Sequence, residues 1–306
     1  MFRLRNKSIP SIVFAQNQGF MRILQIIAFL FLSHFAQGQS SLEEDLSFYG
    51  DVMIHALEDA HKERARQNFN SLFLDFVSQQ GSIDTSLSFM KYVSFLELEP
   101  DELSLVTWQT CLSDGHCDYE GFLFIKDSEP IRLNRTEPLG KDVLYTTSDT
   151  EDWYGCWYYA FKKLSDSQYL LFGYDGSSIY DNQMLVDVLT LSPEGISFGD
   201  DIFEDKETPG TFTNRLLLSY SSDASVSLNY SEGLGMIIHD HLTPRMGLQA
   251  GQGATNLPDG TYEGYRETEG KWMYIQKVFD HVYDEAPRPK PTGGSGLFDK
   301  SSGSNK

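Results

Sequence analysis

The sequence predicts a mainly β (α+β) protein, in which an antiparallel β-domain follows a short helical cap and precedes a disordered tail. From about residue 103, apolar and polar residues alternate with a period of two, which is typical of strands. Turn signals such as Asp175-Gly176 and Glu269-Gly270 separate these runs, and no helical pattern lies between them. A meander sandwich, an open barrel and a propeller-like domain all fit this pattern.

Residues 39–100 are predicted to form the helical cap. Ser41 and Glu44 have the spacing of a capping box, and apolar residues follow at helical intervals up to Leu57. A second helix is predicted over residues 63–78, with Gly81 ending it.

The β-domain is predicted over residues 101–282, with about a dozen short strands. We expect these at residues 103–111, 119–126, 130–133, 154–163, 169–174, 184–191, 196–198, 214–221, 225–230, 236–241, 260–266 and 272–278. The remaining residues, 283–306, are rich in Pro, Gly, Ser and Lys, and we expect a disordered tail because they can bury little apolar surface.

The amino-terminal 38 residues have the pattern of a secretory signal peptide. Basic residues precede an apolar run over residues 23–35, and Ala36-Gln37-Gly38 places small residues before a cut. The run is too short for a membrane anchor. Met21 opens an ordinary signal peptide by itself, so residues 1–20 are interpreted as an upstream extension. We therefore expect an exported protein without a transmembrane segment in its mature chain, located in the periplasm, at the cell surface or outside the cell.

The 306 residues carry a formal net charge of -20. Cleavage after Gly38 would remove four basic residues and no acid, giving a mature charge of -24. Such a charge repels phosphate backbones and argues against nucleic acid as a partner. Hydrophobic residues make up 40% of the chain, which is enough for a substantial core.

Two of the three cysteines flank a turn. Cys111 and Cys117 lie opposite each other if Ser113-Asp114-Gly115 forms a three-residue hairpin loop, and a disulfide then fits; a two-residue turn would offset the pair and leave two thiols. Cys156 is interpreted as a buried apolar residue.

Several short segments stand in one colinear order along the mature chain. They are Trp108, Asp114-Gly115, the WYY of residues 157–159, the LLFGYDG of residues 170–176, the segments 219–228 and 236–244, the PDGTY of residues 258–262, and the GKW of residues 270–272. Together they resemble a group of exported, uncharacterised proteins of Bacteroidetes bacteria. The resemblance implies export in a Gram-negative bacterium and transfers no mechanism. His239 departs from it, because relatives look aromatic or apolar at that position.

His239 and His241 are the candidate metal ligands. Residues two apart on a strand share a face, so both imidazoles would meet one ion if an acidic loop supplied a third ligand. The competing interpretation is that His241 is a hydrogen-bonded structural residue. Acidic loops containing Asp175 and Asp181 have a composition that suits calcium, although a solvated charged loop is the default interpretation and no cofactor is required.

Aromatic residues over 153–159 supply the candidate ligand-binding surface. On a strand, Trp153, Trp157 and Tyr159 would share one face and could line a groove for a glycan or a peptide; core packing on both faces is the alternative. The sequence contains no nucleophile elbow, zinc-protease motif or Walker loop. We therefore expect a non-catalytic binding or envelope-associated protein, whose partner is an envelope protein, peptide or glycan. A metal-dependent hydrolase using the His-x-His motif is the alternative.

Overall fold

The computed structural model describes residues 42–80, 90–133, 135, 141–176 and 178–279. The predicted signal peptide and the predicted disordered tail lie outside these residues. The prediction of a mainly β, antiparallel protein with short amino-terminal helices is confirmed, and no barrel is closed. No helix in the described ranges has the length and apolarity to cross a bilayer.

The chain divides into two compact units. The first comprises residues 1–113 and 118–132, and the second comprises residues 114–117 and 133–306. The first unit therefore joins the helices to strands that follow them, so the division falls about 30 residues later than the boundary expected near residue 100.

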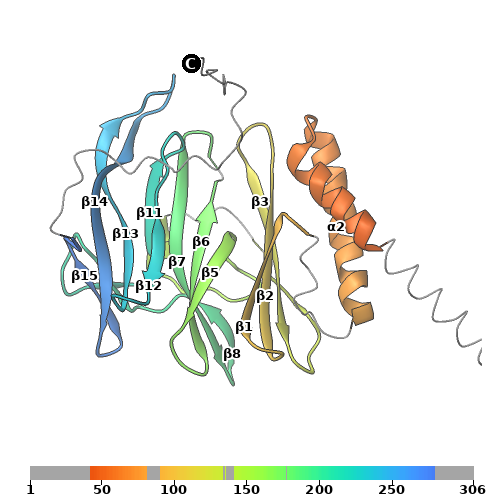
Figure 1. Ribbon diagram of the computed structural model, residues 1–306, viewed down its shortest axis with the longest axis horizontal. Helices are drawn as coiled ribbons and strands as arrows, with labels where there is room; N and C mark the ends of the chain where they lie inside the picture. Colours follow the sequence, from red (N-terminus) through yellow and green to blue (C-terminus); the bar gives the residue numbers. More distant parts are fainter. Residues whose placement is uncertain (1–41, 81–89, 134, 136–140, 177, 280–306) are drawn as a thin grey trace, which may run out of the picture. The chain divides into compact units, whose positions relative to one another are not determined.

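The first unit contains a helix over residues 42–55, the helix α2 (Asp59–Gln80) and a four-stranded sheet. Its strands pair in the order β1 (Val93–Glu99), β2 (Leu103–Cys111), β3 (Cys117–Ile125) and β4 (Ile131–Leu133) (Figure 1). Helix α2 begins at Asp59, four residues before the predicted start. The charged residues from Asp59 to Arg66 thus form its first two turns.

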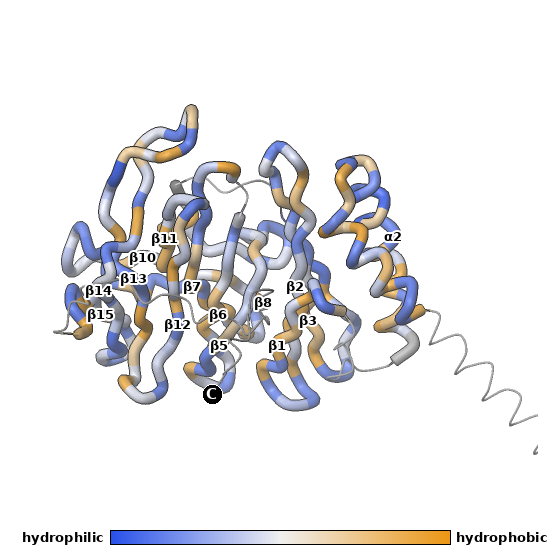
Figure 2. The backbone as a smooth tube through the Cα atoms, turned by 45° about the horizontal axis from the view of Figure 1, so that its top comes forward, coloured by the Kyte–Doolittle hydropathy of each residue, from blue (hydrophilic) through white to orange (hydrophobic). Residues whose placement is uncertain are grey.

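Aromatic packing fixes α2 to this sheet. Hydrophobic and hydrophilic residues alternate around the helix (Figure 2), and Phe69 and Phe73 lie on its buried face. Both rings contact the indole of Trp108 on β2, with centroids 5.3 Å and 5.0 Å away. Phe73 also contacts Phe122 on β3. Aromatic burial of this kind is a main source of stability in a small core.

The second unit contains a five-stranded and a six-stranded sheet. The first follows the order β11 (Leu216–Ser221), β7 (Asp181–Ser192), β6 (Gln168–Asp175) and β5 (Trp157–Lys163), with β8 (Gly195–Phe198) on β7. The second follows the order β10 (Phe212–Thr213), β9 (Phe203–Glu204), β15 (Lys271–Ile275), β14 (Ala254–Thr268), β13 (Met236–Met246) and β12 (Leu228–Ser231). All pairs are antiparallel except a single parallel bridge between Trp272 and Phe203. A short 3-10 helix spans Lys141–Leu144.

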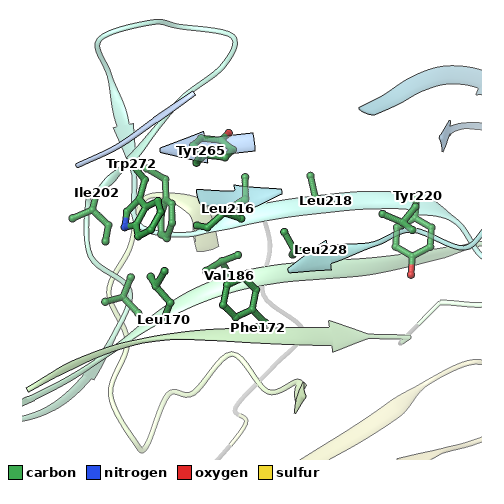
Figure 3. Close-up of a cluster of buried hydrophobic side chains, with 14 residues drawn as sticks. Leu170, Phe172, Val186, Ile202, Leu216, Leu218, Tyr220, Leu228, Tyr265 and Trp272 are labelled. Atoms are coloured by element: carbon green, nitrogen blue, oxygen red, sulfur yellow. The ribbon is translucent and has the colours of Figure 1, made fainter. Parts of the chain in front are cut away.

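One hydrophobic cluster joins the two sheets of this unit. It takes side chains from β6, β7 and β11 on one side and from β12 to β15 on the other. Figure 3 shows Ile202 and Trp272 at one end of the cluster and Tyr220 at the other. Two sheets that share one apolar layer form a sandwich.

Candidate functional site

The aromatic segment predicted as a strand over residues 154–163 is irregular up to Cys156. Gly155 has a φ of 77°, and a Cβ at this position would lie 2.5 Å from Cδ of Arg135. Only glycine fits this backbone. Strand β5 therefore begins at Trp157, and the side-chain alternation expected for residues 153–156 does not hold.

The three candidate ligand-binding aromatics lie in different surroundings. Trp153 is fully buried, and its Nε1 donates to the hydroxyl of Tyr158. The Tyr159 hydroxyl donates to the carbonyl of Leu228 at 2.6 Å, while its ring packs on the cluster between the sheets. Trp157 and Tyr159 are both partly exposed, and Nε1 of Trp157 is buried. The structure does not bring these side chains together into an open groove.

The two candidate acidic ligands contact different groups. Asp175 is buried, and its Oδ2 lies 3.6 Å from Nη2 of Arg135. Asp181 accepts a hydrogen bond from the hydroxyl of Thr255. Neither contact includes His239 or His241.

His239 lies in the interior of the sandwich. It pairs with Glu263 across β13 and β14, and its ring lies 6.0 Å from that of Tyr265. Its Nδ1 donates to the carbonyl of Asp240, whereas its buried Nε2 has no hydrogen-bond partner among the described residues. Burial lowers the pKa of His239, so the ring is neutral near pH 7.

His241 lies between two carboxylates. A register shift between Asp240 and Leu242 displaces it from regular pairing. Its Nδ1 is 2.8 Å from Oδ2 of Asp259, and its Nε2 is 3.3 Å from Oε1 of Glu263. The two ring nitrogens point in opposite directions, so these acids cannot bind one ion together with the ring. No group of three His, Cys, Asp or Glu side chains in the described ranges is arranged to hold a metal.

Glu263 connects three strands and a loop. It is buried on β14 and accepts a hydrogen bond from the Tyr274 hydroxyl at 2.6 Å. Nζ of Lys206 lies 3.6 Å from its Oε2. Desolvation and the hydrogen bond to Glu263 raise the pKa of Tyr274, so this phenol remains a donor. The cluster is thus a set of mutually neutralising contacts that links the adjacent strands β13, β14 and β15 within the sheet.

Cys111 and Cys117 are both disulfide-bonded, and Cys156 is a free, buried cysteine.

The end of the hairpin that follows β2 also contacts the start of α2. Asp59 accepts hydrogen bonds from the backbone amide and the hydroxyl of Ser113, at 2.9 Å and 2.6 Å. Both bonds lower the pKa of Asp59. The carbonyl of Cys111 accepts a hydrogen bond from Lys62 at 2.6 Å.

The first unit contains a half-open cavity of about 350 Å³, which we call the Gly50 cavity. Its volume lies at the lower end of the range for small-molecule sites. Its deepest lining residues, Leu46, Phe69 and Met90, are buried apolar side chains. The remaining lining residues are Glu44, Ser47, Phe48, Gly50, Asp51, Lys91, Tyr92 and Val93.

Gly50 occupies an interior position of the helix over residues 42–55, on the face that carries Leu46 and Met53. Glycine costs about 1 kcal/mol relative to alanine inside a helix. A Cβ at residue 50 would meet Phe69 at 3.6 Å and Tyr92 at 3.9 Å, which are ordinary contacts. Packing therefore does not require glycine at this position. The missing side chain leaves space that joins the cavity.

Polar groups stand at the rim of the Gly50 cavity. The Tyr92 hydroxyl lies 3.2 Å from Oδ1 of Asp51 and 3.5 Å from Nδ1 of His55. His55 and Asp51 are also 3.2 Å apart. Desolvation and the Asp51 carboxylate raise the pKa of Tyr92, so the phenol stays protonated. An apolar floor with a few fixed polar groups is the usual composition of a binding site.

The floor of the cavity is held by a buried ionic network beneath α2. Glu120 on β3 accepts hydrogen bonds from Nε1 of Trp108 at 2.9 Å and from Arg66 at 3.2 Å. Asn70 donates to the same carboxylate. These contacts fix the helix that carries Phe69, so the ring under Gly50 has a defined position.

A second, wider hollow of about 1040 Å³ lies at the carboxyl-terminal half of α2. Its rim is acidic, with Asp75, Asp101 and Asp127 among its lining residues, and Glu102 pairs with Lys126 at 2.8 Å. It is more polar than the Gly50 cavity. Charged, solvated side chains of this kind do not define a specific site.

The sequence patterns singled out no residue of the Gly50 cavity as a candidate binding residue, and Glu44 was noted only for its place in a capping box. The available signal was a glycine on the apolar face of a predicted helix, where it costs stability. Comparisons of the chain with protein-family models, with curated proteins and with solved structures found no match.

Proposed function

We propose that this protein is a non-catalytic binding protein and that its ligand enters the Gly50 cavity. The observation that carries the proposal is the glycine at residue 50, which lowers helix stability and leaves the cavity open although a Cβ would fit. A site that gives up stability to keep a space open is typical of a functional site.

The lining predicts the kind of group that binds. Leu46, Phe69 and Met90 favour one apolar group of about the size of a large side chain. Tyr92 presents a phenol next to the Asp51 carboxylate, which together can meet an amide or an amine at the mouth. An apolar body with a polar end is therefore the ligand that these residues suit.

We further propose that the protein acts after export from the cytoplasm. The signal-peptide pattern supports this location, and the disulfide-bonded Cys111 and Cys117 suit an oxidising compartment. Amino-terminal sequencing of the protein secreted by a Gram-negative host is expected to begin at Gln39. Retention of residues 1–38 on the recovered protein would contradict this part of the proposal.

Filling the cavity tests the binding function. Gly50→Met places a flexible apolar chain in the space, and Gly50→Ala is the matched control because its Cβ makes only ordinary contacts. The probes are N-acetyl-leucine and N-acetyl-phenylalanine methylamides, followed by ligand-observed NMR and by chemical shifts of the protein.

We expect both probes to bind wild type and Gly50→Ala, and we expect at least tenfold weaker binding to Gly50→Met. Gly50→Ala should also be about 1 kcal/mol more stable than wild type. Equal binding to all three proteins, or binding to none, would refute the assignment of the cavity.

A further inference from the structure

Strand β1 is an edge of its sheet. Among the described strands it pairs only with β2, so the backbone groups on its other side have no strand partner there. The turn before it lines the Gly50 cavity, and the Val93 amide donates to the carbonyl of Met90 at 3.3 Å. The free edge that starts at Ser94 therefore begins beside the cavity mouth. An edge of this kind is a template for another extended chain.

The register of β1 shows which side chains of an added strand would reach the cavity. Val93 pairs with Trp108 and Phe95 pairs with Val106, so these residues share the face of the sheet that packs under the helices. Directly opposed residues of neighbouring strands share a face. A residue placed opposite Val93 by a new strand would thus point to the side of the sheet where the cavity lies.

Charged residues and a β-bulge restrict which part of this edge can pair and which partner it can accept. The stretch from Val93 to Leu96 carries no charged residue, whereas the register shifts between Glu97 and Glu99. Glu44 and Asp51 add two carboxylates at the cavity, against a single cation, Lys91. The three carboxylates of Glu44, Asp51 and Glu97 outnumber this cation, which favours a basic partner.

We propose that the ligand is an extended peptide that adds to β1, places one apolar side chain in the Gly50 cavity and sets basic residues beside Glu44 and Glu97. This inference rests on the proposed binding function and specifies its ligand. Backbone hydrogen bonds along the edge supply affinity, and the cavity together with the acids supplies specificity.

The probe is the blocked pentapeptide acetyl-Lys-Thr-Leu-Thr-Lys-amide, measured by isothermal titration against the full protein. Three matched peptides test its features: Glu replaces both Lys, Ala replaces Leu, or alternate backbone amides are N-methylated. We expect each change to weaken binding at least tenfold. The loss of affinity caused by replacing both Lys residues with Glu should become smaller at high salt, because exposed charges are screened.

Two variants locate the peptide on the protein. Gly50→Met should weaken binding of the parent peptide to the affinity of the peptide in which Ala replaces Leu. The double variant Glu44→Lys and Glu97→Lys, at one exposed and one half-buried site, should reverse the preference, so that the Glu peptide binds more tightly than the Lys peptide. Both variants can be checked for folding by their thermal unfolding.

The outcomes separate this inference from the function on which it rests. If the methylamide probes bind the cavity but N-methylation and charge do not affect the pentapeptide, the cavity stands and the peptide edge is refuted. If no probe binds, both fail. Dimerisation through β1 that excludes the peptide would also overturn the inference, and light scattering would detect it.

Discussion

Both units contain a buried carboxylate that is paired with arginine, and the pairs at Asp187 and at Glu120 are compensated to different extents. In the second unit, Asp187 and Arg215 are almost fully buried, with Oδ1 and Nε 2.9 Å apart. The Tyr158 hydroxyl and the Val188 amide also donate to Asp187, each at 2.9 Å. The other nitrogens of Arg215 donate to the carbonyls of Val143, Thr146 and Phe198 and to the hydroxyl of Ser148.

Glu120 of the first unit is also buried, but its cationic partners reach solvent. Arg66 is 23% exposed and Arg132 is 52% exposed. Burial raises the pKa of Glu120 despite Arg66, Asn70, Trp108 and Arg132, which favour the ionised form. The comparison teaches that depth alone does not set the cost of a buried charge. What decides it is whether every polar atom around the charge finds a partner away from water.

The largest expected effect comes from removing one partner of the fully enclosed pair. Arg215→Met leaves Asp187 charged and buried, and this should lower the free energy of unfolding by about 3–5 kcal/mol. The measurement is urea denaturation at pH 7. The double variant Arg215→Met and Asp187→Leu should recover a large part of the loss. A single variant that costs less than about 1 kcal/mol would show that Asp187 is solvated.

A smaller effect is expected at His239, whose Nε2 is the unpaired buried atom noted above. His239→Phe keeps a ring against Tyr265 and removes that atom, so stability should rise by about 1 kcal/mol at pH 7. The pKa of His239 is lowered in the folded protein, so its contribution is present above its ordinary value of 6.5 and is lost as the pH falls. The advantage of His239→Phe over wild type should therefore grow below pH 6.5. An advantage that stays constant from pH 8 to pH 5 would contradict this.

The smallest effect is expected at Glu120. Glu120→Gln should change stability by less than about 1 kcal/mol at pH 7, because burial offsets much of what the cations contribute. Its raised pKa means that the stability it contributes is fully present below its ordinary value of 4.5 and is lost as the pH rises. The free energy of unfolding of wild type should therefore rise relative to that of Glu120→Gln as the pH falls from 7 to 4. Denaturation at three pH values checks the sign, and the opposite trend would show that the cations dominate.

The regular strands were predictable because their apolar residues alternate along most of their length. The strand predicted over residues 103–111 has the observed bounds of β2, and both helices occur close to their predicted positions. Strand β1 was missed, since its sequence mixes Phe95 with Glu97 on one face and a register shift moves Glu99 to the other. Strands β9 and β10 are two residues long, which is too short for a periodic pattern, and they pair with each other. The bridge from β9 to β15 joins distant segments, which no local pattern reports.

The candidate site was less predictable than the fold. The aromatic segment was predicted as a strand because its residue types are common in strands. A single residue with a left-handed backbone conformation, Gly155, breaks the alternation of its side chains. The His-x-His pattern predicted that both rings would face one ion. In the structure, a register shift instead sets His241 between Asp259 and Glu263. The Gly50 cavity depends on how a helix, α2 and the start of β1 pack together, and this packing lies beyond local sequence patterns.

The parallel bridge between Trp272 and Phe203 has a consequence for the order of folding. The amide of Trp272 donates to the carbonyl of Ile202 at 2.7 Å, and Tyr274 donates its amide to Glu204. Strand β9 therefore joins the rest of the sheet only through a strand that is synthesised about 70 residues later. Pairings of such long sequence separation form slowly. A nascent chain that ends before Lys271 should leave one end of the sandwich open, so the sandwich can close only after nearly the whole unit has been synthesised.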